Sequence, residues 1–196
     1  MDFGKLVVRL VVGGFFMGHG LQKLRGAFGG PGLEGTEQMM TALSLHPAKL
    51  NARAAALSET VGGAGIALGA GTPFASAALI GAMATAVRTV HFKNGLWTSG
   101  GGWEYNAVLM AVVAGLTNDG PGDLSLDALI GRKRWGLGWS VFAVVAGLAG
   151  SAAAIEAGRR LAPPDEDEGA DGGQRGPVST DDPARGATAE SADPSI

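Results

Sequence analysis

The chain has 196 residues, of which 46% are hydrophobic and 17% are charged, whereas soluble domains average about 25% charged residues. Its 34 glycines, together with the low charge, favour a membrane protein, in which glycine is tolerated and lets helices pack closely. The lack of cysteine excludes disulfides, thiolate metal sites and iron–sulfur clusters within the chain.

The charge is divided between two parts of the chain. Residues 1–161 carry 13 basic and 9 acidic side chains, a net charge of +4, and include every long apolar run. Residues 162–196 carry 2 basic and 9 acidic side chains, a net charge of −7. This segment has few large apolar side chains and cannot offset the entropy lost on ordering. We therefore predict a disordered acidic tail over 161–196, solvated rather than bound to a basic partner.

Five apolar segments approach the ~20 residues that a membrane-spanning helix needs. In chain order they are residues 3–24, 50–70, 73–92, 103–117 and 136–155. The first is expected to be a retained span and not a cleaved signal, because Arg9 interrupts it and no small-residue cleavage site follows. The prediction is an all-α, polytopic transmembrane bundle with a four-helix core over 1–131 and a fifth transmembrane helix over 132–160.

The links between the spans differ in character. Residues 25–49 begin glycine-rich and then predict a short surface helix near 36–45. Residues 91–106, HFKNGLWTSGGGWEYN, predict a tight hairpin whose Trp97, Trp103 and Tyr105 suit the headgroup level of a bilayer. The link before the fifth span predicts a turn and a short interfacial helix with Ser125 as its N-cap.

Polar residues of the first four spans gather toward one end of the bundle. Successive spans alternate in direction, and the helical rise of ~1.5 Å per residue gives the depth of each side chain. Only Arg9 lies deep toward the opposite end. Ionisable groups inside a span are costly, so they face the bundle interior, a partner or a water-filled cavity. The candidate intramembrane cluster is His19, Lys23, Glu59, Arg88, His91, Glu104 and Asn106.

Helical spacing adds detail to this cluster. Arg88 and His91 are three residues apart and are expected to share a helix face. Gly62 and Gly63 follow Glu59 by three and four residues, which predicts that a neighbouring helix approaches closely beside this carboxylate.

Several of these segments together resemble the DoxX family of small bacterial membrane proteins. The matching stretches are RLVVGGFFMGHGLQKL (9–24), SETVGGAGIALG (58–69), HFKNGLW (91–97), WEYN (103–106) and GPGDLSLD (120–127). The resemblance covers roughly residues 4–131. It implies a four-helix core in the bacterial plasma membrane. Some relatives are subunits of thiosulfate:quinone oxidoreductases, and others belong to membrane complexes linked to oxidative-stress defence.

Four interpretations of the polar cluster remain open. It can be a structural network in which Glu59 pairs with Lys23 or Arg88 and fixes the helix register. It can relay protons to a quinone, because histidine and carboxylate side chains act as acid and base. It can bind an anion or a lipid headgroup, for which arginine is well suited. A divalent metal is disfavoured, because Lys23 and Arg88 would repel it.

We expect a DoxX-like membrane subunit of a redox system linked to quinone or to oxidative-stress defence. The chain is thus a candidate oxidoreductase subunit. The chain shows no site for a covalent cofactor, so electron transfer would need a bound quinone and soluble or membrane redox partner proteins. The alternatives are a non-enzymatic membrane scaffold that anchors partner proteins and a small proton-coupled transporter. The lipid bilayer is the expected environment, and no nucleic-acid signature is present.

Overall fold

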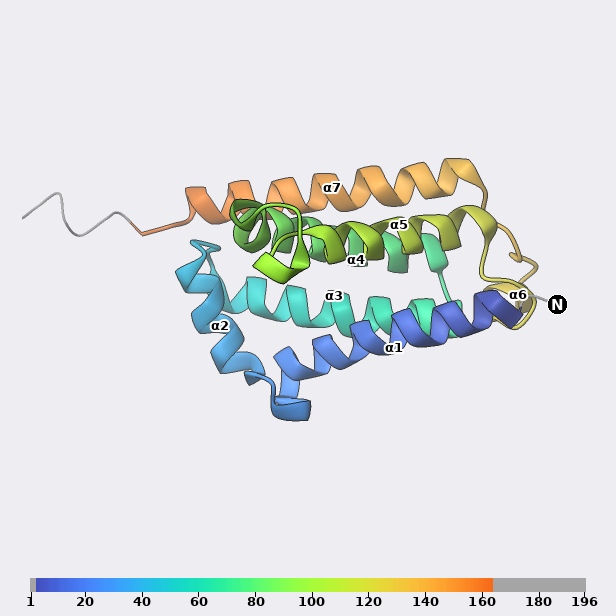
Figure 1. Cartoon of the computed structure of the whole chain (residues 1–196), viewed down its shortest axis with the longest axis horizontal. Helices are drawn as coiled ribbons and strands as arrows, with labels where there is room; N and C mark the ends of the chain where they lie inside the picture. Colours follow the sequence, from blue (N-terminus) through green and yellow to red (C-terminus); the bar gives the residue numbers. More distant parts are fainter. Residues whose placement is uncertain (1–2, 164–196) are drawn as a thin grey trace, which may run out of the picture. The chain divides into compact units, whose positions relative to one another are not determined.

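The computed structural model describes residues 3–163, and this part of the chain is helical without a strand (Figure 1). Two short helices, α2 (Gly32–Ala42) and α6 (Leu126–Leu129), occupy links between longer ones. The long helices are α1 (Phe3–Arg25), α3 (Ala48–Leu68), α4 (Thr72–Ala86), α5 (Glu104–Asp119) and α7 (Leu137–Arg160). The predicted all-α fold class is confirmed. The predicted acidic tail falls outside the described residues beyond position 163.

Each predicted span corresponds to one long helix. Within residues 3–163, the helical stretches Phe3–Arg25, Thr72–Asn94 and Leu137–Arg160 are long and apolar enough to cross a membrane. The other two helices fall short by that measure: α5 has 16 residues, below the usual minimum of about 17, and α3 carries Lys49, Arg53 and Glu59. Both pack against the three apolar stretches, since α3 lies against α1 and α4, and α5 against α4 and α7. The chain is a helical membrane protein.

Large apolar side chains point outward from the two terminal helices. Val11 and Phe15 of α1 are exposed, as are Val145 and Leu148 of α7. Such faces would be unfavourable in water but suit lipid, where the backbone of a helix is satisfied internally. The interior instead holds residues such as Phe16, Ile66, Leu79, Ile80 and Val113.

Glycine brings α1 and α3 into close contact (Figure 1). A Cβ atom at Gly63 would lie 2.7 Å from the carbonyl oxygen of Gly13, and one at Gly20 would collide with Thr60. No larger residue fits at these points while the helices keep this separation. The close approach that the glycines after Glu59 predicted is therefore confirmed, and it sets the distance across which Glu59 meets α1.

Helix α7 packs on α4 and α5 through small and hydroxyl-bearing residues. A Cβ atom at Gly147 would lie 2.8 Å from the Ala77 carbonyl oxygen of α4. Ser151 is 3.0 Å from the Thr85 hydroxyl, and the Ser140 hydroxyl donates to the Ala114 carbonyl of α5 at 2.8 Å. Hydroxyl contacts of this kind join helices in membranes, where apolar burial alone drives little association. The fifth helix is therefore an integral member of the bundle.

Arg9 joins α1 to the end of α3 and to the loop before α6. Figure 1 shows that the start of α1 and α6 lie at the same end of the bundle. The Arg9 side chain is 2% exposed and donates to the carbonyls of Ile66 (3.1 Å) and Ala67 (2.9 Å) at the end of α3. It also donates to the carbonyls of Pro121 and Leu124 in the loop before α6. The last carbonyls of a helix lack intrahelical partners, so Arg9 satisfies the Ala67 carbonyl, whereas the Ile66 carbonyl also accepts from the Gly69 N–H at 3.1 Å.

Asp127 of α6 caps α4 at the same end. Its carboxylate accepts hydrogen bonds from the backbone N–H groups of Gly71 (2.7 Å) and Thr72 (3.0 Å) and from the Thr72 hydroxyl (2.8 Å). The indole N–H of Trp135 donates to it at 2.9 Å. A carboxylate at a helix N-terminus accepts hydrogen bonds from free N–H groups and interacts favourably with the positive end of the helix dipole. The predicted N-cap Ser125 is also confirmed, since its hydroxyl accepts from the Ala128 N–H at 3.2 Å.

Candidate functional site

A cavity of about 750 Å³ lies at the other end of the bundle, beside α2 and the hairpin at residues 91–106. Residues of α1, α2, α3, α4, α5 and α7 line it, and most of its wall is apolar. The small residues Ala78, Gly81, Gly150 and Ala154 of α4 and α7 form part of its wall. Volumes of about 300–1,000 Å³ are typical of pockets that bind small molecules. The cavity is therefore large enough for a ligand of ordinary size.

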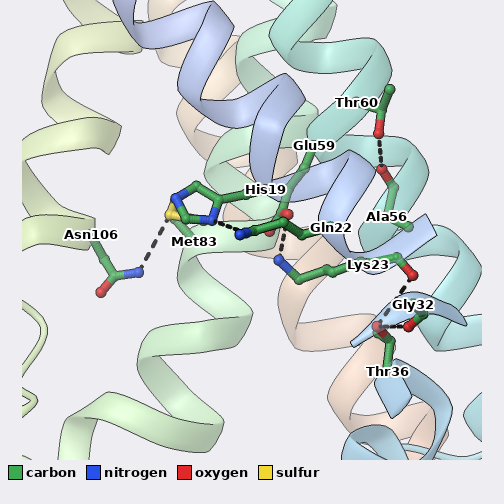
Figure 2. Close-up of polar contacts among 10 residues, drawn as sticks. All are labelled: His19, Gln22, Lys23, Gly32, Thr36, Ala56, Glu59, Thr60, Met83 and Asn106. Carbon is green, nitrogen blue, oxygen red and sulfur yellow. Dashed lines mark hydrogen bonds and ion pairs between the residues drawn. The ribbon is translucent and has the colours of Figure 1, made fainter. Parts of the chain in front are cut away.

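The ion pair of Lys23 with Glu59 lies in this cavity wall (Figure 2). Lys23 Nζ is 2.6 Å from Glu59 Oε2, and the side chains are 22% and 7% exposed. Lys23 comes from the last turn of α1, and Glu59 from the middle of α3. The glycine contacts between the two helices make this pairing possible. The contact also shows which of the two proposed cations pairs with Glu59, because Lys23 does so and Arg88 does not.

His19 and Asn106 add further polar groups to the same wall. His19 Nδ1 lies 3.0 Å from Gln22 Oε1, one helical turn further along α1. Asn106 is 8% exposed, and its side-chain amide donates to Met83 Sδ at 3.4 Å. Thioether sulfur is a weak acceptor. The amide of Asn106 is therefore held loosely and can exchange this contact for a better acceptor.

His91 lines the cavity from the side of the hairpin. Its Nδ1 atom lies 2.8 Å from the carbonyl oxygen of Gly101, which also accepts a bond from the Asn94 amide at 3.2 Å. A carbonyl oxygen can only accept, so Nδ1 donates to it and Nε2 is left for another partner. The hairpin thus fixes the orientation of one histidine in the cavity wall.

Two members of the predicted cluster lie elsewhere. Glu104 Oε2 accepts a hydrogen bond from the Thr98 backbone N–H at 3.0 Å, so this carboxylate closes the hairpin and does not line the cavity. Arg88 lines a separate, smaller pocket. The expectation that Arg88 and His91 share a face is wrong, because residues Val87–His91 form a π-helical turn. A π-turn holds more residues than an α-turn, which rotates residues three apart onto different sides.

Sequence reasoning missed several residues of the cavity. Met39 and Met40 of α2 cover it, and Tyr105 of α5 lines it although the sequence placed that ring at the headgroup level. Small residues of α7 form one wall. Their spacing of three and four residues, from Gly147 through Gly150 and Ser151 to Ala154, is a signal that could have found this wall. In the described chain, no three His, Asp or Glu residues gather as a metal site would require.

Comparison with known proteins identifies the family. Residues 4–92 match the DoxX family. The resemblance to this family is therefore confirmed over residues 4–92. No curated protein and no solved structure matches the chain. The matched segment runs from α1 to the end of the π-turn, so it contains His19, Lys23, Glu59 and His91, whereas Asn106 of α5 and the wall formed by α7 lie beyond it.

Proposed function

We propose that this DoxX family protein is a membrane subunit of a redox system and that it binds a quinone in the cavity. The observation that carries the proposal is the amphiphilic character of the cavity. Its wall is mostly apolar, yet it contains the Lys23–Glu59 pair, two histidines and the loosely held amide of Asn106. A ligand that suits such a wall has an apolar body and a few hydrogen-bonding atoms.

The polar groups of the cavity fit a quinone. Its ring and prenyl chain are apolar, and its two carbonyl oxygens are hydrogen-bond acceptors. The Lys23 ammonium and the Asn106 amide are donors that could hold those oxygens. A bound quinone supplies a two-electron, two-proton acceptor.

The contribution of the chain itself is binding and proton transfer. Glu59 holds the ammonium of Lys23 at 2.6 Å and keeps that charge at the cavity wall. His91 presents a ring nitrogen whose orientation is fixed by its bond to the Gly101 carbonyl. Imidazole and carboxylate groups are the usual carriers of protons in proteins. Because the chain has no cysteine, the electrons in this proposal come from a redox partner protein.

The proposed setting is the bacterial plasma membrane, in a complex linked to quinone reduction or to oxidative-stress defence. Three apolar stretches in the described chain and the family match support a membrane location. The resemblance to relatives in quinone-linked and stress-defence complexes supports the more specific setting.

Extraction of small molecules from the detergent-purified protein, followed by mass spectrometry, tests the proposal. The wild type is expected to carry a quinone, and the Glu59→Gln variant to carry much less, because the Lys23 ammonium loses the partner that positions it. Glu156→Gln is the matched control, because it makes the same chemical change at an exposed position. There Glu156 pairs with Arg160. This control is expected to retain the quinone.

A second variant separates binding from folding. Lys23→Met with Glu59→Gln removes both charges together and avoids the unpaired Lys23 ammonium that Glu59→Gln alone leaves. It is expected to be folded, as judged by its elution from a size-exclusion column, and still to lack quinone. A wild type that carries no quinone, or an equal load in all variants, overturns the proposal. A co-purifying soluble protein without a bound quinone would then favour the scaffold.

A further inference from the structure

A second, smaller pocket of about 350 Å³ lies at the same end of the bundle as the large cavity. Three of the residues that line it are cationic: Arg88 from the π-turn, Lys93 from the 3₁₀ turn at Phe92–Asn94, and Arg159 from the last turn of α7. Residues 42–45, at the end of α2 and directly after it, line the pocket as well, together with Thr89 and Ile155. Two consecutive turns and the distant end of α7 thus bring positive charge to one hollow.

None of the acidic residues in the described chain lines this pocket. Within residues 3–163, Arg88, Lys93 and Arg159 form neither an ion pair nor a side-chain hydrogen bond. The nearest acid along α7, Glu156, pairs instead with Arg160 at 2.8 Å. Like charges that converge without a counter-charge repel one another, so an anion bound between them is stabilised by all three.

The donor set suits a phosphate group. A guanidinium group offers paired N–H donors that match the oxygens of phosphate, and two such groups approach the pocket from different elements. Lys93 adds a third positive charge, and Ser44 adds a hydroxyl group. Phosphate has several acceptor oxygens that point in different directions, so it can use donors on three sides at once.

The surroundings place the pocket near the level of lipid headgroups. Phe92 is 69% exposed and Trp97 is 67% exposed in the adjoining hairpin, and aromatic rings of this kind favour the membrane interface. Leu43, Leu45 and Thr89 line both the pocket and the large cavity, so the two hollows adjoin. A phosphate ester with an apolar chain could therefore reach both.

We propose that Arg88, Lys93 and Arg159 form a binding site for a phosphate group, carried either by the headgroup of an anionic phospholipid or by a soluble phosphate. This site goes beyond the proposed quinone function and does not depend on it. The family match ends at residue 92, so Lys93 and Arg159 lie outside it and complete a site that the matched segment alone does not contain.

Binding measurements on the full chain in detergent test this site. Native mass spectrometry measures adducts with dioleoyl-phosphatidylglycerol, and dioleoylglycerol serves as the same lipid without phosphate. The wild type is expected to bind the phospholipid, and the triple variant Arg88→Gln, Lys93→Gln, Arg159→Gln at least about tenfold more weakly, since it loses three charge-assisted contacts. The acidic residues after position 162 are present in both proteins, so any competition from them is shared.

The matched control changes three exposed cations that line neither hollow: Arg25→Gln, Lys49→Gln, Arg53→Gln. It removes the same charge and is expected to bind within about twofold of the wild type, because an exposed charge without a specific contact contributes little. A finer pair compares Arg159→Gln with Arg160→Gln, of which only the first changes a pocket residue. Each of these side chains is exposed, so loss of fold is not expected.

Competition by inorganic phosphate distinguishes the two sources. Displacement of the lipid by millimolar phosphate, together with phosphate binding measured by calorimetry, assigns the site to soluble phosphate. Lipid adducts that persist in phosphate assign it to the phospholipid headgroup, and either result supports the proposal. The proposal is overturned if the two triple variants lose the same affinity for the phospholipid, or if dioleoylglycerol binds as tightly as the phospholipid. It is also overturned if neither the phospholipid nor inorganic phosphate binds.

Discussion

Arg9 and Glu59 are both buried charges inside helices, and they are satisfied in different ways. Arg9 donates to the carbonyls of two segments, so its contacts are all with the backbone. Glu59 meets the side chain of Lys23, and it lies in the wall of a cavity. Buried backbone carbonyls at a helix end need a hydrogen-bond donor whether or not a ligand is bound. Arg9 is therefore structural, whereas the Glu59 pair can exchange partners with a ligand.

Replacement of Arg9 by methionine is expected to destabilise the protein by roughly 3 kcal/mol or more, because several buried carbonyls lose their donor. Lysine at this position should recover only part of the loss, because one ammonium group cannot reach carbonyls on opposite sides. Unfolding in sodium dodecyl sulfate, followed by circular dichroism, measures the difference. Arg25→Met is the control, and this exposed arginine should change stability by less than about 0.5 kcal/mol. Equal stability of Arg9→Met and Arg25→Met would contradict the structural role.

At the scale of the element, small residues decide which helices meet. Each long helix was predictable from its apolar run, because a spanning segment must satisfy its backbone internally and so forms a helix. The close approach of a neighbouring helix to α3 was also predictable, from Gly62 and Gly63 after Glu59, although the sequence did not name that helix; Gly63 meets α1 and Gly62 meets α4. The place of α7 was not, because its small residues recur along the whole helix and nothing in their spacing names α4 as the partner.

Gly147→Ala is expected to destabilise the bundle by about 1–3 kcal/mol, because the new methyl group collides with the α4 backbone at Ala77. Gly150→Ala in the same helix is the matched control. A Cβ atom there has no neighbour within 4 Å, and alanine favours the helix by up to about 1 kcal/mol. Thermal denaturation in detergent micelles should therefore shift in opposite directions for the two variants.

A cross-link shows whether Gly147→Ala acts by moving α7. The chain has no cysteine, so the pair Thr85→Cys and Ser151→Cys gives a clean background. These hydroxyls lie 3.0 Å apart, and oxidation is expected to join the two helices. Addition of Gly147→Ala should reduce the yield, and Gly150→Ala should not. An unchanged yield in the Gly147 variant would mean that its effect does not come from separation of α4 and α7.

At the scale of the whole molecule, the alternation of the spans located the polar end of the bundle but not the contacts within it. His19, Lys23, Glu59, His91 and Asn106 line one cavity because neighbouring helices run in opposite directions. Arg88 lies in a different pocket because of the π-turn, and Glu104 is used by a local backbone group. Neither the local helix geometry nor the choice of a hydrogen-bond partner is encoded in hydropathy, so periodicity alone could not predict them.

The opposite end was the least predictable part, because its contacts join residues far apart in the sequence. Asp127 caps α4 from a position 55 residues beyond Thr72. The surrounding GPGDLSLD stretch predicted a turn and the N-cap Ser125 and was a point of family resemblance, but nothing in it predicted the contact of Asp127 with α4. Asp127 and Arg9 together hold α1, α3, α4 and α6 at this end. The stability of the whole bundle should consequently depend on the charge of one carboxyl group.

Acid should therefore destabilise the protein through Asp127. Burial raises the pKa of this carboxyl group, but hydrogen bonds from Thr72, Trp135 and Gly71 lower it more, so the folded-state pKa lies below its ordinary value. Because the folded pKa is lower than the unfolded one, the ionised group stabilises the fold fully above the unfolded pKa of about 3.9. This stabilisation is lost as the pH falls from there through the folded pKa.

Thermal unfolding of the wild type and Asp127→Asn between pH 7 and pH 3 measures this dependence. The variant is expected to be less stable at pH 7, and the difference should shrink as the pH falls below about 3.9, where the carboxyl group of the unfolded chain takes up a proton. Asp123→Asn is the control, because the ion pair of Asp123 with Lys133 is exposed on both sides and contributes little. A difference between wild type and Asp127→Asn that stays constant over this range would show that the carboxylate does not hold this end of the bundle through its charge.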